Sequence, residues 1–159
     1  MNIDIICVGN LRERFWKEGA DEYIKRLKSY CNIEIVQIKE APLPKNASLK
    51  DEENVKTIEG NAIKGKIKKQ TYVIALDVKG KELSSEGLAE KIAKLGVEGK
   101  SRITLLIGGS LGLSKEVLMQ ADAKISFSKM TFPHQLMRVI LLEQLYRAFK
   151  INNGEVYHK

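Results

Sequence analysis

The distribution of apolar residues along the chain predicts five buried β-strands. Apolar residues occur in short continuous runs, with little alternation between apolar and polar positions. Runs of this kind are typical of strands that are covered on both faces, as in a parallel sheet. The runs lie at residues 3–9, 33–38, 71–77, 102–108 and 123–128. We therefore expect a sheet with helices on both of its faces.

The segments between these runs carry the spacing of helices. Ser48 precedes Asp51 by three residues, which is a capping-box pattern, and Gly96 can close the helix that begins near Ser84. Helices are predicted at about residues 12–30, 48–67, 84–96, 114–121 and 134–151. Because strands and helices alternate, the sequence predicts an α/β fold, a parallel-type sheet flanked by helices. The length of 159 residues suits one domain that covers residues 1–159.

The last predicted helix is apolar on nearly every face, whereas a surface helix of a globular protein has a polar side. Cover on most sides can come from the chain itself or from a second copy of the chain. We expect a homodimer formed through this helix, with burial inside one chain as the alternative. The apolar positions are Leu136, Met137, Val139, Ile140, Leu141, Leu142, Leu145, Tyr146 and Phe149.

Charge and cysteine content narrow the class of protein. The net charge of +7 favours a polyanion such as RNA as the partner. The lysines between Lys64 and Lys69 fit either a helix end, where cations oppose the dipole, or contacts with RNA phosphates. Two cysteines, Cys7 and Cys31, are too few for a disulfide framework or a zinc site, so we expect no metal. With no signal peptide and no apolar segment near the ~20 residues of a membrane span, the expected location is cytoplasmic.

Two strand-to-helix loops are candidates for a ligand site. The segment "LLIGGSLGLS" at 105–114 lacks the spacing of a Rossmann or P-loop motif, so it is either a tight turn or a different kind of ligand loop. The segment "FSKMTFPHQLMR" at 127–138 also follows a strand, and Pro133 can begin the next helix. His134 is interpreted as an ordinary first-turn residue. Side by side, the two loops would form a cleft with many backbone groups and little charge, suited to a neutral or cationic adenosine ligand.

Three stretches of the chain resemble a known enzyme family. They are "IGGSLGLS", "SFSKMTFPHQLMRVILLEQLYRAFKI" and the terminal "YHK", and the likeness extends to "VGNLRERFWKEGADEYIKRL" near the start. Together they resemble the large-subunit (23S) ribosomal RNA pseudouridine N3-methyltransferases of the SPOUT class. The resemblance implies a SPOUT-like fold with a C-terminal trefoil knot, S-adenosyl-L-methionine as methyl donor and a homodimer. It also implies methylation at N3 of a pseudouridine in helix 69 of 23S rRNA within the assembled ribosome.

The resemblance also implies particular site residues. The implied catalytic residues are Arg147, Tyr157 and His158. Asp77 is interpreted as a turn residue rather than as a ribose ligand. The implied cofactor-binding residues are Leu76, Gly108, Phe127, Ser128, Lys129, Met130, Thr131 and Phe132, all at the ends of predicted strands.

The reaction needs the imide proton of N3 to leave, and a general base would assist. His158 is the preferred base, although the sequence does not decide which residue takes the proton. Tyr157 could stack on the target base, and Arg147 could stabilise developing negative charge. Glu143, four residues before Arg147, forms with it either a simple ion pair or a buried pair that orients the guanidinium. Arg138 is interpreted as structural or interfacial.

Three alternatives compete with this interpretation. A nucleotide-binding oxidoreductase is disfavoured by the missing G-x-G-x-x-G motif, and a non-enzymatic ribosome-binding protein by the complete loop and tail. A different target nucleotide within the same class is the third. Chain ends commonly fray, but here we expect the turn at Asn153 and Gly154 to direct Tyr157 and His158 back toward the cofactor loops. The sequence leaves open whether these loops belong to the same subunit or to its partner.

Overall fold

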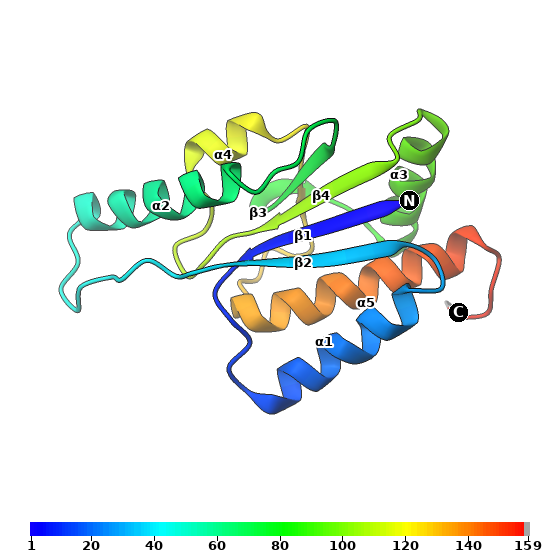
Figure 1. Cartoon of the computed structure of the whole chain (residues 1–159), viewed down its shortest axis with the longest axis horizontal. Helices are drawn as coiled ribbons and strands as arrows, with labels where there is room; N and C mark the ends of the chain where they lie inside the picture. Colours follow the sequence, from blue (N-terminus) through cyan, green and yellow to red (C-terminus); the bar gives the residue numbers. More distant parts are fainter. Residues whose placement is uncertain (158–159) are drawn as a thin grey trace.

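The computed structural model describes residues 1–157 and consists of a parallel sheet with helices on both faces (Figure 1). All pairings between neighbouring strands are parallel, and the strand order is β2-β1-β4-β3-β5. The strands are β1 (Asn2–Val8), β2 (Asn32–Ile38), β3 (Tyr72–Glu82), β4 (Arg102–Ile107) and β5 (Ala123–Ser126). The predicted α/β fold is confirmed.

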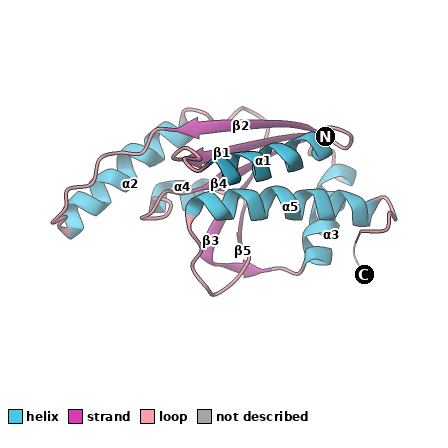
Figure 2. Ribbon diagram, turned by 90° about the horizontal axis from the view of Figure 1, so that it is seen from below, coloured by secondary structure: helices cyan, strands magenta, loops and turns pink. Residues whose placement is uncertain are grey.

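The helices form a layer on each side of the sheet. Helices α1, α3 and α5 cover one face, and α2 and α4 cover the other (Figures 1 and 2). The helices are α1 (Arg14–Leu27), α2 (Leu49–Lys64), α3 (Ser85–Val97), α4 (Lys115–Gln120) and α5 (His134–Asn152). None of the helices within residues 1–157 is long and apolar enough to cross a membrane.

Strand β1 shows why the strands read as continuous apolar runs. Ile3, Ile5 and Cys7 point into the core under α1, α3 and α5, while Ile6 and Val8 point into the core under α2 and α4. Successive side chains of a strand alternate between faces, so a strand covered on both sides must be apolar at both sets of positions. Both cores are therefore built from the same short runs.

A buried aspartate accounts for part of the lysine cluster. Asp4 accepts from the Nη1 of Arg102 at 2.7 Å and from the Nζ of Lys68 at 3.1 Å. Lys68 also reaches Glu34 at 2.7 Å, and these two carboxylates raise its pKa, with Glu34 the larger cause. Lys64 ends α2, as the helix-end alternative predicts. The cluster thus has a structural role at Lys64 and Lys68.

Local capping signals set the helix starts as predicted, but one helix end differs. Ser48 and Asp51 form a complete capping box at the start of α2. Gly96 does not end α3, which continues to Val97. The residue with a left-handed backbone after this helix is Gly99, with φ of 74°. The turn that closes the helix also contains a hydrogen bond from the amide of Lys100 to the carbonyl of Leu95.

Strand β3 changes register against β5 beside the ends of the sheet. Leu76 and Lys81 both pair with Ile125, so the intervening residues leave the ladder. At Gly80 an added Cβ would lie 2.6 Å from the carbonyl carbon of Ile125, and only glycine permits this approach without a shift. The detour carries Asp77 away from the sheet pairing. The trefoil knot implied by the resemblance stays a prediction.

Helix α5 packs along one side against α1 and α3 (Figure 2). Its fully buried residues are Arg138, Leu141, Leu142, Leu145 and Ala148. Other apolar side chains of the helix, among them Leu136 and Ile140, keep part of their surface exposed. One chain therefore covers one side of this helix, and the homodimer that would cover the rest stays a prediction.

Candidate active site

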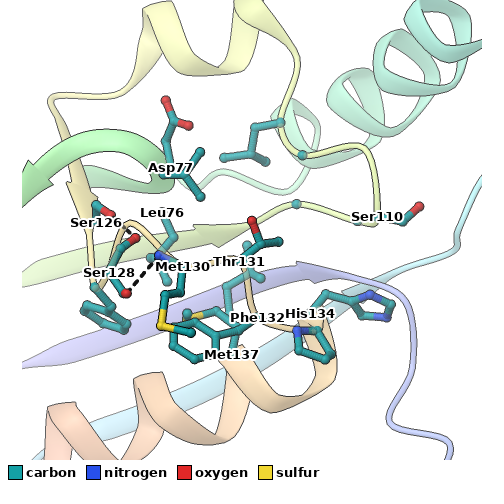
Figure 3. A pocket seen from close by; sticks show the side chains of 18 of the residues that line it. Leu76, Asp77, Ser110, Ser126, Ser128, Met130, Thr131, Phe132, His134 and Met137 are labelled. Carbon is teal, nitrogen blue, oxygen red and sulfur yellow. Dashed lines mark hydrogen bonds between the residues drawn. The ribbon is translucent and has the colours of Figure 1, made fainter.

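A cavity of about 650 Å³ opens at the ends of β3, β4 and β5. Its walls come from residues 76–78, from the glycine loop 107–113 and from residues 125–128 and 130–134, with Met137 of α5 (Figure 3). The carboxyl ends of parallel strands are where open α/β sheets bind ligands. The two loops predicted to lie side by side do so, and they form the cavity together.

The glycine loop folds tightly against itself. Gly109 and Gly112 pair as an isolated antiparallel bridge, and the amide of Gly112 donates to the carbonyl of Gly109 at 3.0 Å. An added Cβ at Gly108 would lie 2.6 Å from the carbonyl carbon of Gly112. Because that neighbour is backbone, the loop could accept a side chain at Gly108 only by shifting. The residue type at Gly108 therefore maintains the shape of the cavity wall.

Serine hydroxyls hold the second loop. Ser126 donates to the carbonyl of Ser128 at 2.9 Å, and the hydroxyl of Ser128 accepts from the amide of Met130 at 2.9 Å (Figure 3). These bonds are local, so the sequence itself bends the chain here. The loop surrounds the cavity with Phe127, Thr131 and backbone groups.

Most of the cofactor-binding residues implied by the resemblance lie on the cavity wall. Lys129 is the exception, since it is exposed and lies outside the lining. The residues on the wall are Leu76, Gly108, Phe127, Ser128, Met130, Thr131 and Phe132. The wall is thus largely apolar side chains and main chain.

The cavity contains little charge. Among the described residues that line it, Asp77 and His134 are the ones with titratable side chains. One Asp77 carboxylate oxygen accepts from the amide of Lys79 at 3.3 Å, as expected of a turn residue. In residues 1–157 no three His, Cys, Asp or Glu side chains come together in a way that could hold a metal ion. Such a cavity suits a ligand that is neutral or cationic.

The implied catalytic residues Arg147 and Tyr157 lie together near the other end of α5. Arg147 donates to the same Glu143 oxygen through Nη2 at 2.7 Å and through Nε at 3.0 Å. The guanidinium carbon lies 4.7 Å from the centre of the Tyr157 ring, and the Tyr157 hydroxyl donates to Glu143 at 3.2 Å. The side chains of Arg147 and Glu143 are 25% and 18% exposed, so this is the largely buried, orienting pair.

Burial makes the hydroxyl of Tyr157 harder to ionise. Burial is the largest cause that raises the pKa of Tyr157 to about 12, and the neighbouring Tyr23 and Glu143 add to it. The phenol, which is neutral at physiological pH even with an ordinary pKa, therefore stays a hydrogen-bond donor at higher pH as well. His158 lies outside the described residues.

The tail turns back, but Tyr157 does not approach the cavity of its own chain. Gly154 adopts a left-handed φ of 66°, and Tyr157 packs edge-on against Tyr146 with ring centres 5.0 Å apart. Met137 lies on the cavity wall ten residues before Arg147 on α5, which is about 15 Å at 1.5 Å per residue. Within one chain aromatic packing holds Tyr157 beside Arg147. The return of the tail toward the cofactor loops of one subunit or the other stays a prediction.

Two residues of the cavity region escaped the sequence-based prediction. His134 lines the cavity, and its Nε2 lies 3.5 Å from Glu40 Oε1. The other Glu40 oxygen accepts from the Nη2 of Arg12 at 2.9 Å. The position of His134 directly after the loop was a usable signal. Glu40 follows β2, far away in the chain, and no local pattern connects it with His134.

Arg138 has a structural role, as interpreted. Its side chain is 1% exposed, and Nη2 donates to the carbonyl of Gly9 at 2.7 Å. This bond ties the chain after β1 to the first turns of α5, next to His134.

Comparison with known proteins agrees with this geometry. The family model described as a predicted SPOUT methyltransferase matches residues 1–158. The chain is 62% identical over its full length to all of a protein of Clostridium novyi named ribosomal RNA large subunit methyltransferase H, and 55% identical, again full length, to one of the same name from Clostridioides difficile. A probable methylase family protein of known structure from Haemophilus influenzae shares the fold, with a TM-score of 0.53, 14% identity, 99% of this chain covered and 70% of that one. The chain belongs to the SPOUT methyltransferase family.

Proposed function

We propose that this methyltransferase transfers a methyl group from S-adenosyl-L-methionine to N3 of a pseudouridine in helix 69 of 23S rRNA, in assembled ribosomes in the cytoplasm. Two full-length relatives carry the name of a large-subunit rRNA methyltransferase. The observation that carries the proposal is the weakly charged cavity between the two strand-end loops. A net charge of +7 adds the attraction that an RNA substrate requires.

The cavity fits the proposed methyl donor. Leu76, Phe127 and Phe132 provide apolar surface for a purine ring, and the loops provide backbone donors and acceptors for its edge and for the ribose. Gly108 and residues 128–131 complete the proposed binding residues. When bound, the donor supplies a methyl group on a cationic sulfonium, which a wall of low charge accommodates. Catalysis then depends largely on how the protein aligns the nucleophile with that methyl group.

We infer that two subunits contribute to each active site. In one chain the cavity and the Arg147–Tyr157 pair lie about 15 Å apart along α5. A homodimer that packs the partly exposed apolar side of α5 against its twofold mate would bring the tail of one subunit near the cavity of the other. In this arrangement Arg147 binds an RNA phosphate or a uracil carbonyl, and Tyr157 stacks on the base. Light scattering at micromolar concentration should give the mass of a dimer, and a monomer would refute the sharing.

Mixed dimers test the sharing directly. One parent carries Arg147→Met and the other carries Gly108→Ala, and the assay uses a concentration of S-adenosyl-L-methionine at which each homodimer alone has little activity. If the sites are shared, random pairing produces mixed dimers with one intact site, and about a quarter of the wild-type activity returns. If each site lies within one chain, a mixed dimer has no intact site and the activity stays at background.

The substrate is tested in cells and with purified ribosomes. Mass spectrometry of 23S rRNA should find the methylated pseudouridine in cells with the gene and the unmethylated base in cells without it. An unchanged methylated base after deletion would refute the substrate. Purified protein should methylate intact ribosomes much faster than naked 23S rRNA, because a chain of this size has little surface for reading a sequence. Equal rates would contradict recognition of the ribosomal surroundings.

A further inference from the structure

We propose that His134 is the general base that accepts the N3 proton of the target nucleotide, and that Glu40 is the residue that positions its imidazole. This inference rests on the proposed function and adds a catalytic residue from the same chain that forms the cavity. It differs from the interpretation of the sequence, which favoured His158 as the base.

The reaction requires a proton acceptor at the cavity. An imide nitrogen is a poor nucleophile until its proton leaves, and a positioned base accelerates such a step by about 10²–10⁴-fold. Of the two titratable side chains among the described lining residues, Asp77 accepts a bond from the amide of its own turn. His134 stands at the other end of the cavity, below Ser110 (Figure 3). As a side-chain type, an imidazole is a stronger base than a carboxylate, so His134 is the better acceptor of the two.

The contacts of His134 determine which nitrogen is available. Nε2 faces Glu40 Oε1 at 3.5 Å, and the side chain keeps 24% of its surface exposed. With the proton on Nε2 directed to the carboxylate, Nδ1 has the lone pair that can accept a proton. A carboxylate behind the imidazole also stabilises the imidazolium that forms, as in other carboxylate–histidine pairs.

Glycine permits the approach of the pair. Gly9 has a left-handed φ of 82°, and an added Cβ there would lie 2.8 Å from Glu40 Oε1 and 3.2 Å from His134 Nε2. The backbone after β1 thus passes directly beside both groups. A side chain at Gly9 would separate the carboxylate from the imidazole.

Charged groups from four elements surround the pair. Glu40 follows β2, and Arg12, which follows β1, holds its second oxygen at 2.9 Å. Burial and, to a smaller extent, the charge of Glu40 raise the pKa of Glu59 of α2, and Arg138 of α5 bonds to the carbonyl of Gly9. Arg12 thus pairs with Glu40 directly, and Arg138 holds the backbone that passes beside the pair.

The proposed step is balanced in atoms and charge. The N3–H bond breaks and its proton passes to Nδ1 of His134, which becomes an imidazolium. The electron pair left on N3 forms the new bond to the methyl carbon, while the bond between that carbon and sulfur breaks and its electrons stay on sulfur. The imidazolium then returns its proton to water, and Glu40 holds the ring through the cycle.

The test measures single-turnover methylation of ribosomes against pH. We expect His134→Gln to lose 10²- to 10⁴-fold in rate near pH 7 while its affinity for S-adenosyl-L-methionine, measured by calorimetry, stays within about twofold. The loss should shrink as the pH rises, because the imide then ionises without help. Glu40→Gln should lose about tenfold in the rate at saturating enzyme while the enzyme concentration for half-saturation stays unchanged, because a ring that is no longer held aligns less often with the N3 proton.

Control variants separate this inference from its alternatives. Glu18→Gln, an exposed carboxylate paired with Arg14, should leave the rate unchanged. His134→Asn, with folding checked by thermal melting, repeats the test with a smaller side chain. A rate within threefold of wild type for both His134 variants, or a loss of equal size at every pH, would overturn the role of His134. The proposed function fails separately, if the wild-type protein leaves ribosomes unmethylated.

Discussion

The two ends of α5 differ in the kinds of chemical groups that surround them. At its start, near His134, the helix meets a cavity made mainly of backbone and apolar side chains, with Asp77 and His134 as the described titratable groups of the wall. Near its end, Glu143, Arg147 and Tyr157 form a cluster of charge and aromatic rings. The cavity near His134 takes its shape from the ends of the parallel strands. The cluster near Arg147 is formed by side chains that pack on the helix itself. One helix thus separates the proposed cofactor site from the side chains that we propose contact RNA.

Because of this difference, the two ends should respond differently to substitutions. Main-chain geometry tolerates changes in many side chains but not a change of shape, so the cavity should be sensitive at its glycines. The cluster of Glu143, Arg147 and Tyr157 depends on individual side chains. It should therefore be sensitive to their removal and insensitive to small shifts of the nearby backbone. The following experiments test this contrast in order of decreasing effect.

Removal of residues 157–159 should abolish methyl transfer, with a rate loss of about 10³-fold or more, because Tyr157 and its neighbours leave the proposed RNA side of the site. Binding of S-adenosyl-L-methionine should persist, since Tyr157 packs on α5 away from the cavity wall. Calorimetry and a ribosome methylation assay measure the two properties separately. Near-normal turnover by the truncated protein would remove the tail from the site.

Replacement of Arg147 by Met should reduce turnover by about 10²-fold with unchanged cofactor affinity, because the guanidinium is held by Glu143 for a role outside the cavity. Arg147→Lys should recover little, since a single ammonium cannot reproduce the planar fork. The matched control is Arg14→Met, which breaks an exposed ion pair of the same spacing with Glu18. Equal effects at Arg14 and Arg147 would mean that a general loss of positive charge is responsible.

Gly108→Ala should weaken cofactor binding by about tenfold or more, because the new Cβ would collide with the backbone of Gly112 and displace the loop. Gly87→Ala in the first turn of α3 is the control, since its Cβ would meet neighbours no closer than 3.6 Å. Calorimetric titration of both variants with S-adenosyl-L-methionine gives the comparison. Unchanged affinity in Gly108→Ala would show that the loop shape does not govern binding.

Glu59→Gln should change the difference in the free energy of unfolding between pH 4 and pH 8 by less than about 1 kcal/mol. Burial, the largest cause, raises the pKa of Glu59, which accepts from the amide of Ala41 at 3.0 Å. A raised carboxyl pKa means that the folded state binds the proton more tightly, so the contribution of Glu59 to stability is fully present below its pKa in the unfolded chain and is lost as pH rises through the raised pKa. Glutamine keeps the acceptor without the charge and should flatten this fall. Melting temperatures between pH 4 and 8 measure it, and identical slopes for the two proteins would contradict the cause.

The fold was predictable because its information is local. Each continuous apolar run became a strand, since a two-sided sheet needs both faces apolar, and Ser48 and Asp51 marked the start of α2 as a capping box does. The register shift between Leu76 and Lys81 was not predictable, because it depends on the pairing with β5 far along the chain. Gly80 marks the place, but a glycine alone does not say which backbone approaches it.

The candidate site was predictable in part for the same reason. Two strand-end loops in succession are enough to predict the cavity from the order of residues alone. The position of Tyr157 was not predictable, because packing against Tyr146 and Arg147, rather than the turn at Gly154, determines where it stops. The approach of Glu40 to His134 also arises only from the tertiary fold.

The bond between Arg138 and the carbonyl of Gly9 joins residues that are 129 positions apart. Strand β1 lies inside the sheet, and its second neighbour β4 is synthesised long after it. Pairings between distant segments form slowly, because closing a long loop costs entropy before the new contacts offset that cost. The pairing of β1 with β4 and the bond from Arg138 to Gly9 must therefore wait until these later segments have been synthesised. A growing chain has no complete cavity, and the methyl donor can stabilise the protein only after nearly all of it has left the ribosome, the particle on which we propose it acts.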